Sequence, residues 1–316
     1  MKLLNFKNGD TIPIVGLGTW KSKPGEVKQA VIWAIEAGYR HIDCAAVYGN
    51  EEEVGEALAQ AITKGTVKRE DLHITSKLWN DAHAYDHVIP ALQKTLKDLQ
   101  LDYIDEYLIH WPISFKHGVG FPKSREDFLT YQEVPLELTW KAMQEAKEMN
   151  LVKHIGVSNF NISKLEILLA MDGEAPEMLQ VEMHPYLPQD ELVNFCRENG
   201  MLLTAYSPLG SPDSRGDKHQ DDPKLLSDSV VLEIAAKHQI GAGQVLIAWS
   251  VSRDIAVIPK SVHQERIKVN LVAASVELDD QDLMELSAIG IAHRFIDGSI
   301  FTGENSPYNR SDLFEK

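Results

Sequence analysis

Short apolar segments alternate with longer amphipathic segments along most of the chain. The short segments are typical of strands buried on both faces. They lie at residues 12–17, 39–42, 72–75, 107–109, 152–157, 178–182, 201–205 and 256–258. The longer segments repeat apolar residues every three or four positions, which predicts helices. We expect these helices at 25–37, from 51, from about 86, at 135–149, at 163–170, from 188, at 230–238 and 242–253, and from about 264.

Turn and cap residues punctuate this alternation. Gly38 follows the first predicted helix as a stop, and Asn50 precedes the acidic first turn of the second as an N-cap. Pro188 suits a first helical position. Residues 3–5 and 11–14, on either side of Asn8-Gly9, predict a β-hairpin at the start of the chain.

About eight β–α units in 316 residues favour an α/β fold, a parallel (β/α)8 barrel. Because no Ser/Gly linker or low-complexity tract divides the chain, we expect residues 1–316 to form a single barrel domain with an N-terminal hairpin. A doubly wound open sheet is the structural alternative. Two long loops, at 112–134 and 209–227, leave the carboxyl ends of their strands, the face on which barrel enzymes keep their chemistry.

Composition narrows the function classes. The formal net charge of −16 argues against a nucleic-acid or anionic-membrane surface, because both need clustered Lys and Arg. Two cysteines, Cys44 and Cys196, form no disulfide framework and suit a reducing compartment. The chain shows neither a signal peptide nor a membrane-spanning apolar run, so we expect a cytoplasmic protein.

Polar residues stand where three successive strands end, and they suggest a mechanism. Asp43, Lys77 and His110 lie one β–α unit apart, so a barrel brings them to one rim, and Tyr48 lies in the loop after Asp43. We expect Asp43 to orient Lys77, and the Lys77 ammonium to lower the pKa of the Tyr48 phenol. Tyr48 then serves as general acid towards a carbonyl oxygen that His110 orients by a hydrogen bond. Taken singly, each residue is more simply structural, and the constellation carries the prediction.

Two other patterns carry no site. Gly16-Leu17-Gly18 begins a dinucleotide fingerprint, but Lys21 occupies the third glycine position. His83 and His87 have the spacing of a helical metal pair, yet no third ligand stands at suitable spacing, so we predict surface histidines and no metal.

Three segments resemble the signatures of a known family, the aldo-keto reductases. These are Gly38-Tyr39-Arg40-His41-Ile42-Asp43-Cys44-Ala45 with Glu51 and Val54-Gly55, then Lys153-His154-Ile155-Gly156-Val157-Ser158-Asn159-Phe160, then Ile258-Pro259-Lys260-Ser261 with Arg266 and Asn270. They occur in the family's order, and the likeness extends over essentially the whole chain. It is nearest to the aldehyde and aldose reductase branch.

The resemblance implies an enzyme, an NADP-dependent aldehyde reductase that uses NADPH and has Asp43, Tyr48, Lys77 and His110 as catalytic residues. Ser158, Asn159 and Gln180 bind the nicotinamide carboxamide, and Tyr206 stacks on its ring. Thr19 and Trp20 lie beside the cofactor, and Lys260, Ser261 and Arg266 hold the 2′-phosphate. The remaining cofactor residues implied are Lys21, Ser207, Leu209, Ser211, Asp213 and Asn270, with Asp213 pairing with Lys21 or Lys260 to close a belt over the pyrophosphate.

The implied substrate is a small carbonyl compound, and the implied assembly a monomer. The likeness gives an apolar substrate pocket lined by Trp20, Val47, Trp79, Trp111 and Phe121. His263 stands where the family often has Thr, and either adds a donor to the phosphate or fills space. Val269 replaces a residue that is commonly polar or small. A xylose- or aldose-type sugar reductase and a non-catalytic NADP(H)-binding or structural barrel protein are the alternatives.

Overall fold

Eight parallel strands form the centre of the molecule. The computed structural model describes residues 2–211 and 221–314. The sheet runs β12-β11-β10-β9-β6-β5-β4-β3, and parallel bridges Val15–Val257 and Gly18–Lys260 join its two ends. The (β/α)8 barrel predicted from the sequence is therefore confirmed, and the open doubly wound sheet is wrong. The strands are β3 (Leu17–Gly18), β4 (His41–Asp43), β5 (His73–Leu78), β6 (Ile104–Ile109), β9 (Val152–Ser158), β10 (Met178–Glu182), β11 (Leu202–Tyr206) and β12 (Ala256–Val257).

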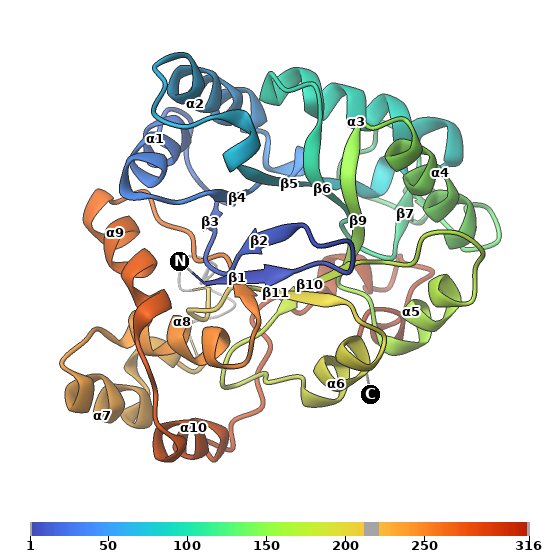
Figure 1. Ribbon diagram of the computed structural model, residues 1–316. Helices are drawn as coiled ribbons and strands as arrows, with labels where there is room; N and C mark the ends of the chain where they lie inside the picture. Colours follow the sequence, from blue (N-terminus) through green and yellow to red (C-terminus); the bar gives the residue numbers. More distant parts are fainter. Residues whose placement is uncertain (1, 212–220, 315–316) are drawn as a thin grey trace.

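Helices surround this barrel, as Figure 1 shows. One helix follows each strand: α1 (Val27–Ala37), α2 (Glu51–Thr63), α3 (Tyr85–Leu99), α4 (Leu136–Glu148), α5 (Ile162–Leu169), α6 (Asp190–Glu198), α8 (Ala242–Ser252) and α9 (Gln264–Val272). Two more, α7 (Ser229–His238) and α10 (Asp280–Ser287), pack against each other outside this ring. Among the described residues, no helix is long and apolar enough to cross a membrane.

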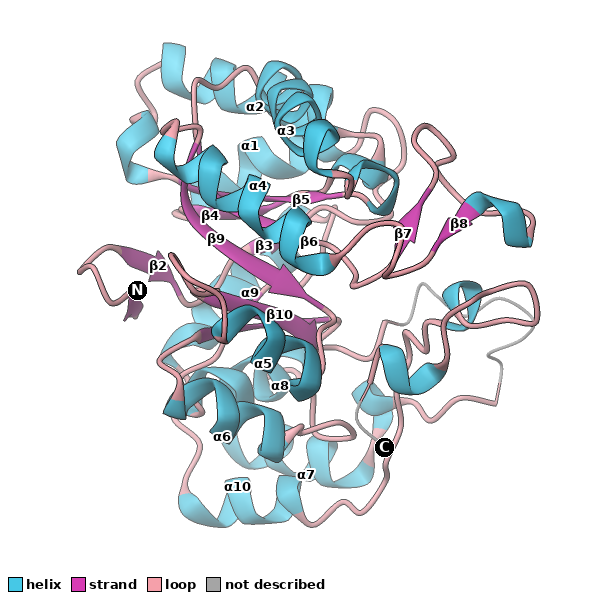
Figure 2. Cartoon of the chain, turned by 90° about the vertical axis from the view of Figure 1, so that its right-hand side faces the viewer, coloured by secondary structure: helices cyan, strands magenta, loops and turns pink. Residues whose placement is uncertain are grey.

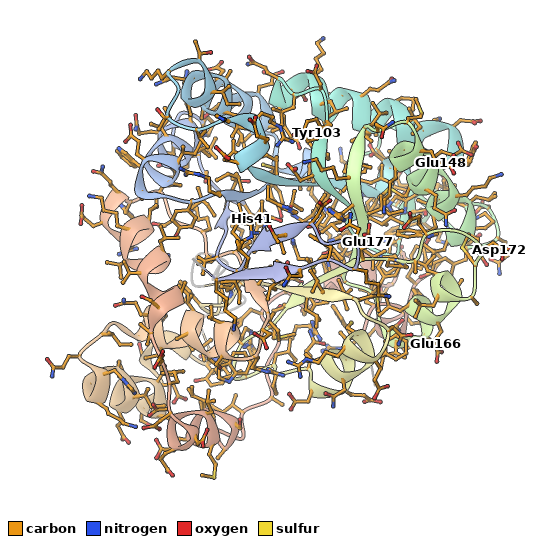
Figure 3. All side chains as sticks on the ribbon, in the orientation of Figure 1. His41, Tyr103, Glu148, Glu166, Asp172 and Glu177 are labelled. Atoms are coloured by element: carbon orange, nitrogen blue, oxygen red, sulfur yellow. The ribbon has the colours of Figure 1, made fainter. Side chains whose placement is uncertain are left out.

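Most helices turn an apolar stripe to the strands and most of their charges to solvent, whereas α8 carries no charged residue and is buried over Val245–Val251. In α1 the buried residues recur with helical spacing, and Gly38 ends the helix at a φ of 107°, which other residues rarely adopt. Figure 3 shows the result: His41 lies in the middle of the molecule, and Glu148, Glu166 and Asp172 lie at its edge.

The two ends of the barrel are covered differently (Figure 2). The predicted N-terminal hairpin is confirmed as β1 (Leu3–Asn5) with β2 (Thr11–Pro13), and Phe6 stacks on His154 with ring centroids 3.7 Å apart. At the other end lies a second hairpin, β7 (Ser114–Phe115) with β8 (Phe128–Leu129), within the long loop after β6.

Three local predictions are wrong. Residues 12–17 do not form one strand: residues 11–13 belong to the hairpin, and the first barrel strand is only Leu17–Gly18. Pro188 precedes α6, which begins at Asp190 after Gln189 in a left-handed conformation. Asn50 stands at the start of α2, but its side chain makes no cap and donates instead to the carbonyl oxygen of Thr19 at 3.0 Å.

Candidate active site

Lys77 and Asp43 form a buried ion pair at the ends of β5 and β4. Lys77 Nζ lies 2.7 Å from Asp43 Oδ1 and also donates to the carbonyl oxygen of Cys44 at 2.7 Å. Both side chains are almost fully shielded from solvent. A buried charge pair is stable only when further hydrogen bonds satisfy both groups. The ammonium is therefore fixed in one place, below the loop that carries Tyr48.

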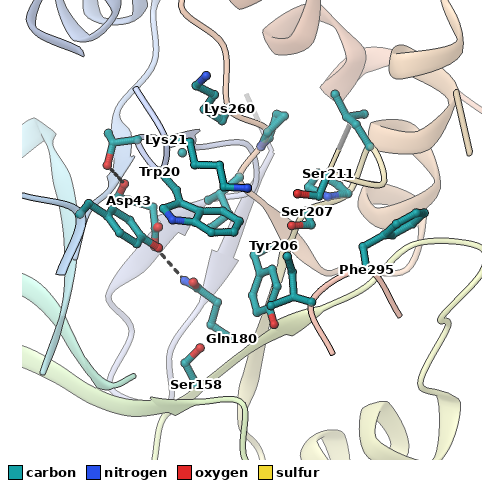
Figure 4. Close-up of a pocket in the computed structure, with 18 of the residues that line it drawn as sticks. Trp20, Lys21, Asp43, Ser158, Gln180, Tyr206, Ser207, Ser211, Lys260 and Phe295 are labelled. Atoms are coloured by element: carbon teal, nitrogen blue, oxygen red, sulfur yellow. Dashed lines mark hydrogen bonds between the residues drawn. The ribbon is translucent and has the colours of Figure 1, made fainter. Parts of the chain in front are cut away.

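The second oxygen of Asp43 is also engaged. Gln180 Nε2, from β10 on the other side of the barrel, donates to Asp43 Oδ2 at 2.8 Å (Figure 4). The Thr19 hydroxyl donates to the Asp43 carbonyl oxygen at 2.8 Å. No local pattern predicts the link to Gln180, because the two residues are 137 positions apart along the chain. It makes Asp43 the point at which β3, β4, β5 and β10 are tied together.

Tyr48 differs from the sequence prediction in its acidity. The Lys77 ammonium lies 5.4 Å from the centroid of the Tyr48 ring and gives its hydrogen bonds to Asp43 and Cys44. Burial, followed by the charges of Asp43, Cys44 and Glu51, raises the pKa of Tyr48 well above its ordinary value. The expectation that Lys77 lowers this pKa is therefore wrong for the structure as it stands. The phenol keeps its proton at neutral pH, as a proton donor must.

His110 faces Tyr48 across the same rim. The two rings meet edge to face with centroids 5.9 Å apart, and Trp79 packs on His110 at 5.2 Å. Burial and the neighbouring charge of Lys77 hold the pKa of His110 well below its usual range, so the imidazole is neutral at pH 7. A neutral imidazole can still donate one hydrogen bond from a ring nitrogen.

These groups open onto a cavity of ≈ 950 Å³ at the carboxyl ends of the strands. The structure brings nearly all residues predicted for the site to its wall. They are Thr19, Trp20, Lys21, Asp43, Val47, Tyr48, Trp79, His110, Trp111, Phe121, Ser158, Asn159, Gln180, Tyr206, Ser207, Leu209, Ser211, Lys260, Ser261, Arg266 and Asn270. Lys77 lies beneath the wall, bonded to Asp43. Asp213, predicted to close a belt with Lys21 or Lys260, lies outside the described residues.

One part of the cavity combines amide groups with a flat ring. The Tyr206 hydroxyl donates to Asn159 Oδ1 at 2.7 Å, and Asn159 Nδ2 donates to Ser158 Oγ and to the His110 carbonyl oxygen. Asn159 has a φ of 62° and Ser207 a φ of 48°, in the left-handed region that Asn adopts more readily than most residues. A hydrogen-bonded set of this kind fits a carboxamide beside an aromatic face.

Another part of the wall carries positive charge. Lys260, Ser261 and Arg266 line it where β12 leads into α9. Glu265 and Gln244 also line the cavity, although the sequence prediction names neither. The His263 backbone N–H donates to Ser261 Oγ at 3.1 Å, and the His263 side chain caps no backbone group of α9. Val269 lines the cavity and is 43% exposed.

The third part is apolar and is built by segments outside the barrel. Trp79 Nε1 donates to the Gly120 carbonyl oxygen at 2.6 Å, which ties the β7–β8 loop to the end of β5. Trp79 and Trp111 belong to a cluster of buried aromatic and aliphatic side chains that is separate from the barrel core. We call it the aromatic cluster; its other buried members are Ile113, Phe115, Phe128, Phe301, Tyr308, Leu313 and Phe314. Phe121, 49% exposed, stands at its rim.

The family resemblance implies that the C-terminal tail, residues 300–316, shapes substrate specificity, but the sequence prediction names no residue of it as part of this wall. Residues 295–301 line the cavity, although none of them was singled out as a site residue. Their signal in the sequence is two apolar pairs, Phe295-Ile296 and Ile300-Phe301, in an otherwise polar stretch. Such pairs mark a segment that packs against something, and only the structure shows against what.

The prediction that His83 lies on the surface is also wrong. His83 is buried and hydrogen-bonded to Ser114 Oγ at 3.2 Å, and burial lowers its pKa to about 3. His87 packs instead on His117, with ring centroids 4.0 Å apart. In residues 2–211 and 221–314, no three His, Cys, Asp or Glu side chains are arranged to hold a metal ion.

Comparison with protein families explains why these residues occur together. The family model described as "Aldo/keto reductase family" matches residues 14–291. The chain belongs to the aldo/keto reductase family. It is thus an oxidoreductase of that family, and the resemblance inferred from the three signatures is confirmed.

Other aldo/keto reductases resemble it over nearly their whole length. An aldo/keto reductase of Synechocystis is 49% identical over 317 residues, which cover 100% of this chain and 97% of the relative. Human aldo-keto reductase family 1 member A1 is 45% identical over 290 residues, covering 91% of this chain and 89% of that protein. The aldose reductase structure from Schistosoma japonicum superposes with a TM-score of 0.88 at 41% identity and covers 98% of this chain and 99% of its own.

Proposed function

We propose that this aldo/keto reductase uses NADPH to reduce aldehydes, and some ketones, to alcohols. One observation carries the proposal: Tyr48, His110 and the Lys77–Asp43 pair stand at one cavity whose wall is cationic at Lys260 and Arg266 and apolar at the aromatic cluster. A proton donor, an anion site and an apolar pocket are what a hydride transfer from a phosphorylated dinucleotide to an apolar carbonyl compound requires.

The residues present fit NADPH. The cavity has room for a dinucleotide, and its wall offers Tyr206 as a flat face and Asn159 and Ser158 as partners for a carboxamide. Gln180 and Thr19 complete this part, although Gln180 Nε2 is already bonded to Asp43. Lys260, Ser261 and Arg266 are suited to a 2′-phosphate, because the Arg fork and an ammonium pair well with a dianion. When bound, the reduced nicotinamide supplies the hydride.

The chain's own residues supply the proton. Tyr48 keeps its phenolic proton at neutral pH because its pKa is raised, and it gives that proton to the carbonyl oxygen as the oxygen becomes negative. Lys77, held by Asp43, then stabilises the phenolate that Tyr48 becomes. Neutral His110 donates a hydrogen bond to the same oxygen and orients the substrate. Trp20, Val47, Trp79, Trp111 and Phe121 hold the apolar part of the substrate and exclude water.

The apolar wall favours this function over a sugar reductase. A pentose has a hydroxyl group on nearly every carbon, and these groups find few partners against Trp79, Trp111 and Phe301. The test follows NADPH absorbance with propanal, benzaldehyde and xylose, run in parallel with NADH. We expect turnover with NADPH and benzaldehyde to exceed that with xylose and that with NADH. Cofactor binding without turnover of any of the three substrates would support the alternative of a non-catalytic barrel protein. A preference for xylose would support the alternative of a sugar reductase.

A further inference from the structure

The last wall of the cavity is a segment that no barrel strand carries. Residues 295–301 follow α10 and cross the open end of the barrel, where Ile296, Ser299, Ile300 and Phe301 face the cavity. We call them the tail wall. Phe301 is buried against Trp79, Trp111 and Phe115 of the aromatic cluster. Ile300 is 55% exposed at the rim.

A single carboxylate holds the start of the tail wall. Glu182, the last residue of β10, is completely buried. Its Oε1 accepts the backbone N–H of Phe295 at 2.6 Å, and its Oε2 accepts the backbone N–H of Ile296 at 2.8 Å. His184 Nε2 lies 2.9 Å from Oε1. The two oxygens thus accept hydrogen bonds from two consecutive backbone N–H groups. A carboxylate can do this because it has two acceptor oxygens, whereas a side-chain amide has only one.

The neighbours of Glu182 leave it no other evident task. It is absent from the cavity lining, and Tyr206, its paired residue on β11, does line that cavity. The Phe295 ring packs between the rings of His184 and His293, with centroid distances of 5.1 Å and 4.6 Å, so the segment is also packed where it is hydrogen-bonded. A buried carboxylate costs solvation energy, which its hydrogen bonds and the nearby charge of Arg294 offset.

We propose that Glu182 is a positioning residue that sets which aldehydes the enzyme accepts, because it fixes the tail wall against the substrate end of the cavity. The proposal rests on the proposed function. A bulky apolar aldehyde buries its ring against the tail wall and gains affinity in proportion to the area covered, whereas a three-carbon aldehyde covers little of it. Loosening the anchor therefore weakens binding of the bulky substrate and leaves proton and hydride transfer unchanged.

The test compares Glu182→Gln with the unaltered protein on benzaldehyde and propanal. Gln keeps one neutral acceptor oxygen and turns an NH2 donor towards the second backbone N–H, so both N–H groups lose a charged partner and one loses its acceptor. We therefore expect the KM for benzaldehyde to rise about tenfold. The KM for propanal and both kcat values should stay within about twofold. Hydrogen exchange at the amides of Phe295 and Ile296 should become faster, because their acceptor is weakened.

Asp105→Asn is the matched control. Asp105 is another buried carboxylate that accepts a backbone N–H, that of Ile74 at 2.9 Å, but it stands near the start of β6, at the far end of the barrel. We expect this variant to lower the melting temperature without changing the ratio of the two KM values or the exchange at Phe295 and Ile296. If it changed that ratio as much as Glu182→Gln does, general destabilisation would explain both and the proposal would be wrong.

A second variant covers the case in which Glu182→Gln does not fold. Ile300→Ala shortens the tail wall at the rim and leaves the anchor intact, so the KM for benzaldehyde should rise alone, without faster exchange at Phe295 and Ile296. With turnover present, an unchanged KM ratio in Glu182→Gln, or in Ile300→Ala where Glu182→Gln does not fold, overturns the role of Glu182 and leaves the proposed function standing. Absence of turnover in the unaltered protein overturns the proposed function instead, while the exchange rates still decide whether Glu182 anchors the segment.

Discussion

At the scale of single residues, the proposed chemistry depends on a phenol that is harder to ionise than a free one. Burial and nearby carboxylates raise the pKa of Tyr48, so its proton is present at neutral pH. In the proposed mechanism this proton leaves only when a carbonyl oxygen becomes basic beside it. We expect Tyr48→Phe to lower kcat by at least about 10²-fold, the usual effect of removing a general acid. The NADPH dissociation constant, measured by fluorescence quenching, should be nearly unchanged. Loss of NADPH binding in this variant would show that Tyr48 has a structural role.

We expect cofactor choice to depend on single side chains as well. Lys260 and Arg266 line the cationic part of the cavity, and NADPH differs from NADH by the 2′-phosphate that we assign to them. Removing one charged partner in Lys260→Ala or Arg266→Ala should raise the KM for NADPH about tenfold or more and change that for NADH much less. Lys28→Ala, which removes an exposed cation paired with Glu56 on α2, serves as the control. Equal changes for both cofactors would mean that neither residue recognises the phosphate.

At the scale of elements, β6 carries a carboxyl group that weakens the barrel as pH rises. Glu106 is fully buried; its Oε2 accepts a hydrogen bond from Thr75 at 3.0 Å and its Oε1 has no partner. Burial, with a contribution from Asp43, raises its pKa to about 8. The folded state therefore holds a proton that the unfolded state releases near its ordinary pKa, so stability falls as pH rises through about 8.

Glu106→Gln should show a smaller drop in melting temperature than the unaltered protein between about pH 5 and pH 8. Glu36→Gln, exposed on α1, should keep the original slope, and identical slopes for all three proteins would refute the assignment.

The elements also show what a sequence can and cannot reveal. The strands and their helices follow from local apolar periodicity, and the rim residues Asp43, Lys77 and His110 follow from the strand ends. The errors arise from contacts that are distant along the chain. Asn50 bonds Thr19 rather than capping its helix, His83 is covered by the β7 segment, and the tail wall is held by Glu182. None of these partners has a spacing that a local pattern could disclose, and the raised pKa of Tyr48 depends on the same packing.

At the scale of the whole molecule, the cavity is where segments from every part of the chain meet. Its wall combines the loops after β3 and β4, the ends of β9, β10 and β11, the start of α9 and the tail wall, so a ligand that fills it links them all. A ligand that binds only the folded state stabilises it by about 2.7 kcal/mol at a hundred times its dissociation constant. We expect NADPH at that level to raise the melting temperature by about 5 °C.

The same measurement separates the cofactor site from its phosphate contacts. NADH at equal concentration should give a smaller shift, since it lacks the group that Lys260 and Arg266 are placed to hold. In Arg266→Ala the NADPH shift should fall towards the NADH shift, while in Lys28→Ala both should keep their original values. A protein whose melting temperature responds to neither nucleotide does not use this cavity for a nicotinamide cofactor. Equal melting-temperature shifts with NADPH and NADH in the unaltered protein would keep the cavity as the cofactor site but contradict a preference for NADPH. Binding energy that does not depend on the 2′-phosphate must come from the contacts that both nucleotides share.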